Sequence, residues 1–125
     1  MNSEIVVGRS TQSNSDIFID SPLNKYGWTA LHAACYFGHM DLVAYIICDL
    51  HADVNLPNKN GWHSLIFAVY GGHLDVVDFL LYDTAVNQDQ RDISHGRSAQ
   101  EIAEYLGDND LIEMFNEWET QNSAD

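Results

Sequence analysis

The chain reads Gly27-Trp28-Thr29-Ala30-Leu31-His32-Ala33-Ala34, then Gly38-His39, Asp41-Leu42-Val43 and Ala52-Asp53-Val54-Asn55. The same order returns as Gly61-Trp62-His63-Ser64-Leu65, Gly72-His73, Asp75-Val76-Val77 and Val86-Asn87. A third, weaker copy reads Gly96-Arg97-Ser98-Ala99, Ile102-Ala103, Gly107 and Asp110-Leu111-Ile112. The opening glycines at 27, 61 and 96 give a period of 34 and then 35 residues. This period predicts a fold built by stacking one small unit.

The composition fits a single globular domain with a strongly acidic surface. The chain has 125 residues, 46% of them hydrophobic, and its 5 Lys and Arg against 19 Asp and Glu give a net charge of −14. Because such a surface repels phosphate groups, we expect no binding to nucleic acid or to anionic membranes. The sequence contains no apolar stretch of bilayer length and no signal-peptide pattern. We therefore expect a cytoplasmic protein, or alternatively a nuclear one.

Each unit is expected to pair two short helices. Apolar residues recur at helical spacing over 30–36 and 41–48, over 64–70 and 74–81, and over 98–106 and 110–118. Thr29 is suited to N-cap the first helix, and Gly38 and Gly72 are suited to end the first helices of units one and two. The predicted domain boundaries are a flexible or partly capping segment at 1–23, a repeat domain at 24–118 (24–57, 58–92, 93–118) and a polar tail at 119–125.

The chain resembles the ankyrin repeat family in Thr29-Ala30-Leu31-His32-Ala33-Ala34, Gly38-His39 and Ala52-Asp53-Val54-Asn55. The resemblance covers about residues 24–118. It implies an all-α solenoid of stacked helix-turn-helix pairs with β-hairpin fingers projecting between neighbours. It also implies a non-catalytic function in binding other proteins.

Several positions depart from the family pattern. Unit two has Ile66 where unit one has His32, the residue that in this family ties neighbouring fingers together, so we expect a weaker tie there. His51 stands where a glycine normally closes the second helix, and the finger at 88–95 is longer than usual.

The resemblance places the family's variable contact positions on one concave face, formed by the fingers and the first helices. Six aromatic side chains fall on this predicted face, and Lys25, Lys59 and Arg97 are expected on successive finger tips beside them. Exposed aromatic residues of this kind are typical of interface centres. The predicted partner-binding residues are Lys25, Tyr26, Trp28, Tyr36, Phe37, Lys59, Asn60, Trp62, Tyr70, Arg97 and Tyr105.

The same residues also admit purely structural roles. The two tryptophans can instead fold back and pack on the neighbouring finger. Tyr36, Phe37 and Tyr70 can belong partly to the core, and the lysines can serve solubility alone.

We expect no catalytic site, no metal site and no cofactor. The histidines recur at repeat positions, and their spacing does not gather three ligands with a cysteine. Cys35 and Cys48 both fall on apolar helical faces, which predicts buried free thiols rather than a nucleophile or a disulfide.

The sequence therefore predicts an adaptor or inhibitor that binds one protein partner through its finger and first-helix face and is monomeric when free. The alternative is a regulatory or structural subunit that docks through its open N-terminal repeat.

Overall fold

The computed structural model describes residues 19–122. Residues 1–18 of the expected N-terminal segment, and 123–125 of the expected tail, lie outside the described residues. The described chain forms the six expected helices. They are α3 (Ala30–Phe37), α4 (Met40–Cys48), α5 (Ser64–Gly71), α6 (Leu74–Asp83), α7 (Ala99–Leu106) and α8 (Asn109–Asn122).

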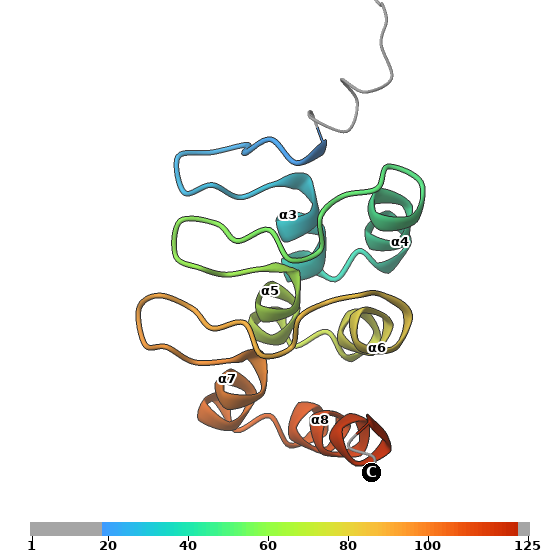
Figure 1. The fold of residues 1–125 in the computed structure, drawn as a ribbon, viewed down its shortest axis with the longest axis vertical. Coiled ribbons are helices and arrows are strands. Elements are labelled where there is room, and N and C mark those ends of the chain that lie inside the picture. Colours follow the sequence, from blue (N-terminus) through green and yellow to red (C-terminus); the bar gives the residue numbers. More distant parts are fainter. Residues whose placement is uncertain (1–18, 123–125) are drawn as a thin grey trace, which may run out of the picture.

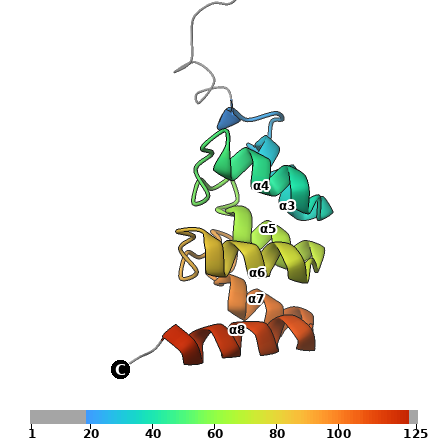
Figure 2. The same cartoon turned by 90° about the vertical axis from the view of Figure 1, so that its right-hand side faces the viewer.

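The helices pair and the pairs stack along one axis. Figure 1 shows α3, α5 and α7 above one another in one row and α4, α6 and α8 in a second row beside it. Figure 2, turned by 90°, shows the second helices one below another, roughly parallel to each other and across the axis of the stack. The all-α repeat fold is confirmed. Within residues 19–122 the fingers are irregular loops, and their pairing is limited to an isolated antiparallel bridge between Arg91 and Ser98.

The ends of the first helices are fixed by local chemistry. Thr29 accepts a hydrogen bond from His32 N, and the His32 ring accepts one from Thr29 N, so the predicted N-cap is confirmed as part of a reciprocal capping box. Ser98 and Glu101 form the same box on α7. Gly38, Gly72 and Gly107 end the three first helices in the left-handed conformation.

The core is densest around α5, which lies between α3 and α7. Every side chain from Leu65 to Val69 is 0% exposed, because a helix with neighbours on all sides needs apolar residues all round. Burial of each large apolar side chain contributes about 1.5–3 kcal/mol. Trp118 joins α8 to α6, because its Nε1 donates a hydrogen bond to the Leu81 carbonyl at 3.1 Å.

The tie between fingers does not weaken in unit two, so that prediction was wrong. His32 Nε2 donates to the Leu56 carbonyl at 2.8 Å. In unit two His63 Nε2 donates to the Asn87 carbonyl at 3.0 Å. The imidazole belongs to the third helical residue in unit one and to the N-cap residue in unit two. In both units it reaches a carbonyl 24 residues further along the chain. Burial lowers the pKa of His32, and it lowers the pKa of His63 to about 4, so both rings are neutral at pH 7.

A second tie joins the helical turns of units one and two. His73 Nε2 donates to the Tyr36 carbonyl at 2.8 Å, and its ring lies against Gly38 and Gly71. A Cβ atom at Gly71 would lie 2.3 Å from the Tyr36 carbonyl oxygen. The absence of a side chain at Gly71 therefore allows α3 and α5 to approach closely.

Three further features differ from expectation. Cys35 is buried as predicted, but Cys48 is exposed, because it lies roughly 200° around α4 from the buried Ile46. His51 takes the place of the usual glycine with φ of 59°, in the left-handed region. The last helix continues through Asn122, so 119–122 of the expected polar tail are helical. No helix in the described part of the chain is long and apolar enough to cross a membrane.

Candidate protein-binding face

Three fingers project from the stack on the side of the first helices (Figure 1). Backbone hydrogen bonds join them in order: Lys59 N donates to the Tyr26 carbonyl at 3.1 Å, and Ile93 N donates to the Asn60 carbonyl at 2.9 Å. We call the finger residues 22–28, 57–62 and 92–97, together with the C-terminal ends of α3, α5 and α7, the finger face. Its backbone is held by the unit-to-unit hydrogen bonds described above.

Each finger turn is held by one side-chain oxygen that accepts two backbone N–H groups at 2.9–3.3 Å. The acceptors are Asn24, Asn58 and Asp92. The second donor in each turn is the residue just before the helix N-cap. These equivalent donors are Trp28, Trp62 and Arg97.

The side chains of these three residues each contact a tyrosine eight residues further along the chain. We call each such pair a rung. The first rung is a T-shaped contact with ring centroids 5.6 Å apart, the second is a stack at 4.3 Å and 17°, and the third is a guanidinium 4.2 Å from a ring centroid. The rungs are Trp28–Tyr36, Trp62–Tyr70 and Arg97–Tyr105. Aromatic pairs of this type contribute about 0.5–1.5 kcal/mol and exposed cation–π pairs about 0.5–1 kcal/mol.

The placement of Arg97 on a finger tip was wrong. Lys25 and Lys59 occupy equivalent, exposed tip positions. The third turn, from Asp92 to Gly96, has one more residue than the turn from Asn58 to Gly61. That extra residue moves Arg97 to the base of the finger, where it takes the place that a tryptophan has in the other units.

The two indoles rest on a buried ring that joins the first two rungs. Phe67 is 0% exposed, and its ring centroid lies 4.6 Å from Trp28 and 5.3 Å from Trp62. His32 stacks on Phe67 at 4.7 Å. Both tryptophans are half-buried, and Trp62 Nε1 is buried without a hydrogen-bond acceptor. The indoles thus pack against the core and still present part of their surface to solvent.

All eleven predicted residues lie on the finger face or at the helix ends behind it. Six are exposed and five are half-buried. Among the aromatic members, the exposed fractions are largest for Tyr105 at 66%, Phe37 at 60% and Tyr26 at 53%. The exposed set is Lys25, Tyr26, Phe37, Lys59, Asn60 and Tyr105, and the half-buried set is Trp28, Tyr36, Trp62, Tyr70 and Arg97.

The positive charge of the described chain is concentrated on this side. Arg91 pairs with Glu101 at 2.6 Å, whereas Lys25, Lys59 and Arg97 have no carboxylate within ion-pair distance among residues 19–122. Lys25 instead lies 5.3 Å above the Tyr26 ring. Burial raises the pKa of Tyr70, which is raised further by Asp92 and lowered by Arg97. Each finger therefore carries one cation without a carboxylate partner, and two of these cations lie over aromatic rings.

The described residues offer little else in the way of chemistry. No group of three or more metal-ligating side chains is found among residues 19–122. Burial raises the pKa of the Cys35 thiol to about 12, so this cysteine is not a poised nucleophile.

Comparison with known proteins identifies the architecture. A family model of three ankyrin repeats matches residues 9–92. The chain belongs to the ankyrin repeat family. Ankyrin repeats are protein–protein interaction modules, and the match ends before the third helix pair, which the structure supplies.

No curated protein sequence matches this ankyrin chain. Among the solved structures that resemble it is a chain of the complex between the predatory endopeptidase Bd0816 of Bdellovibrio bacteriovorus and the immunity protein Bd3460. The two chains align with a TM-score of 0.65 and 28% identity over 71% of this chain. The ankyrin chain described here spans 45% of the length of that chain.

Two parts of the ankyrin face were not found by sequence reasoning. The eight-residue spacing from Trp28 to Tyr36, and its repetition in the next two units, is visible in the sequence and would have placed Arg97 correctly. The central position of Phe67 carries no such signal, because the equivalent residues in the other units are Ala33 and Ile102.

Proposed function

We propose that this ankyrin protein is a non-catalytic adaptor or inhibitor that binds a segment of one protein partner along the finger face. The observation that carries the proposal is the row of three rungs, which recur at the spacing of the repeat. Two of them are pairs of partly exposed aromatic rings, and the third pairs a ring with a guanidinium that has no carboxylate partner. Large rigid aromatic side chains and arginine are the residue types that most often dominate interface energies.

The mechanism is occupancy of the partner's surface. The fingers are joined by backbone hydrogen bonds, and the indoles are braced on Phe67, so the face loses little conformational freedom when it binds. The unpaired Lys25, Lys59 and Arg97 favour a partner segment that carries carboxylates between apolar side chains. The resemblance to a chain from a complex that contains an endopeptidase and its immunity protein is consistent with an inhibitor.

The sharpest test avoids the tryptophans, because removing an indole from Phe67 would also destabilise the fold. Tyr26 and Tyr105 are exposed and contribute little to the core. The double variant Tyr26→Ala/Tyr105→Ala should stay folded, losing only its two exposed cation–π contacts of about 0.5–1 kcal/mol each. It should lose partner affinity by roughly tenfold or more. Tyr82→Ala is the matched control. It removes a 41% exposed tyrosine from α6, which lies outside the finger face.

The wild type immobilised as bait should retain a protein from its native source that Tyr82→Ala also retains and the double variant does not. Isothermal titration calorimetry with the purified partner would then give the affinities. Equal affinity of all three chains would refute binding through the finger face.

A further inference from the structure

One end of the stack exposes a position that the other two units bury. Leu42, Val76 and Leu111 are each the third residue of their second helix. Val76 and Leu111 are 0% exposed because the preceding unit covers them, whereas Leu42 is 46% exposed. Among residues 19–122, no preceding helix pair therefore covers Leu42.

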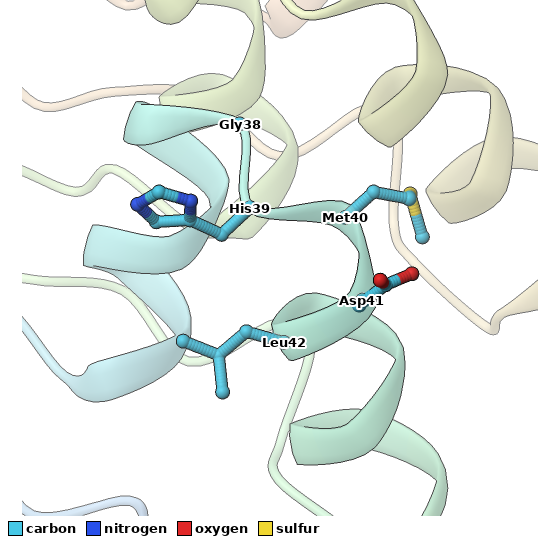
Figure 3. Close-up of a pocket in the computed structure, with 5 residues that line it drawn as sticks. All are labelled: Gly38, His39, Met40, Asp41 and Leu42. Atoms are coloured by element: carbon cyan, nitrogen blue, oxygen red, sulfur yellow. The ribbon is translucent and has the colours of Figure 1, made fainter.

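His39, the residue just before α4, shows the same contrast in exposure with its equivalent in unit two. Its equivalent, His73, is half-buried and donates to the carbonyl of Tyr36 in the preceding first helix. His39 is exposed. Beside it lies an open hollow of about 630 Å³, lined by Gly38, His39, Met40, Asp41 and Leu42. Figure 3 shows the His39 ring and the Leu42 side chain projecting to the same side, with Met40 and Asp41 directed elsewhere.

The surroundings define the chemistry that would fill the hollow. Tyr45, one turn after Leu42 on α4, is 50% exposed and extends the apolar surface. Asp41 and Asp49 are exposed beside it, and the sequence has no Lys or Arg from Gly38 to Asn58. We call His39, Leu42 and Tyr45 the end face. It is apolar at the centre and acidic at the rim.

The sequence of residues 1–18 does not fit the missing cover. In the 34-residue register, the apolar positions of α4 at Val43, Ile46 and Ile47 correspond to three polar residues. These are Arg9, Gln12 and Ser13. At these three positions the segment lacks the apolar side chains that α4 carries.

A second copy of the chain fits poorly as well. Each copy carries a net charge of −14. The free end of unit three exposes Glu104, Glu113 and Glu117, which would meet Asp41 and Asp49. Like charges at such a contact oppose association.

We propose that the end face is a second interaction surface, and that its occupant is a helical element of a partner protein with an apolar stripe and a Lys- or Arg-rich rim. Leu42 and Tyr45 pack against the stripe, the rim pairs with Asp49, and His39 donates to a carbonyl at the end of the partner helix. This surface is independent of the finger face, so either proposal can fail without the other.

The test uses the full ¹⁵N-labelled chain and two synthetic amphipathic helical peptides with the same leucine stripe, one with a lysine rim and one with a glutamate rim. The lysine peptide should shift the amide signals of the end face, and the glutamate peptide should not. Leu42→Asp should lower the affinity for the lysine peptide by roughly tenfold. Tyr82→Asp places the same charge at a 41% exposed position on α6 and should bind like the wild type.

Several outcomes would overturn the proposal. Equal shifts with both peptides, no shifts, or shifts confined to the finger face would refute the end face or its charge preference. Signals of residues 1–18 that move in Leu42→Asp without peptide would show that the chain covers its own end face. If the amide signals of the end face shift as the protein concentration rises without peptide, the end face is a site of self-association.

Discussion

The buried imidazole of His63 should make this ankyrin stack lose stability in mild acid. His63 is 0% exposed, and burial lowers its pKa from the ordinary 6.5 to about 4. Above pH 6.5 the ring is neutral in both the folded and the unfolded chain, so its contribution is fully present. As the pH falls from 6.5 towards 4, the unfolded chain takes up a proton that the folded chain excludes, and stability is lost.

The size of the loss follows from the two pKa values. Between pH 7.5 and pH 5, linkage gives a decrease of about 2 kcal/mol in the free energy of unfolding from His63 alone. Burial also lowers the pKa of His32, which acts in the same direction. Urea unfolding at the two pH values, followed by circular dichroism, measures the total decrease.

The variant His63→Thr isolates the effect, because Thr29 shows that a threonine fits the same N-cap position. This variant should lose about 2 kcal/mol less than the wild type between pH 7.5 and pH 5, whatever its absolute stability. Ile66→Val is the control: it removes one buried methyl group, costs about 1 kcal/mol at both pH values and keeps the wild-type pH dependence. An identical pH dependence in the wild type and His63→Thr would refute the reasoning.

Three further outcomes follow from single positions. His51→Gly should raise the free energy of unfolding by about 1 kcal/mol, because His51 holds φ at 59°; unchanged or lower stability in urea would contradict this. Gly71→Ala should lower stability by about 1–3 kcal/mol, since its Cβ would lie 2.3 Å from the Tyr36 carbonyl oxygen, and a variant as stable as the wild type would exclude that contact. In native buffer Cys48 should react quickly with a thiol reagent, and buried Cys35, with its pKa raised to about 12, should react only in urea; two fast thiols in the native protein would be inconsistent with this structure.

The repeat fold was predictable because its signals are local. The period, the glycine after each first helix and the cap at Thr29 each depend on a few neighbouring residues. The helices begin and end within two residues of the predicted bounds except at Trp118, where α8 continues for four more residues. There the sequence lacks a glycine or proline stop, and the polar composition of 119–122 favours a tail although the backbone stays helical.

Two of the errors have a common physical origin: the tie between fingers and the position of Arg97 depend on the fingers and on contacts between units. In unit two His63 makes the hydrogen bond that His32 makes in unit one. It can do so because an imidazole at the N-cap and one three residues later can both reach the carbonyl 24 residues further along the chain. The shift of Arg97 from tip to rung depends on one extra residue in the third finger. Neither change alters the local pattern of apolar residues, so that pattern does not reveal it. The position of Arg97 can be found only from its eight-residue spacing to Tyr105, which repeats that of the two tryptophans.

The candidate face divides into a fixed base and a variable rim, and this division bears on specificity. Trp28 and Trp62 are held by Phe67, so substituting either one changes the core of unit two as well as the face. Tyr26 and Tyr105 make no such core contact and can be replaced at little cost in stability. If the finger face binds a partner as proposed, the choice of partner should depend mainly on the exposed rim, and the indole base would supply a rigid apolar surface. Arg97 fits this division: at the last rung, where Tyr105 is 66% exposed, a guanidinium replaces the indole without a buried ring like Phe67 to support it.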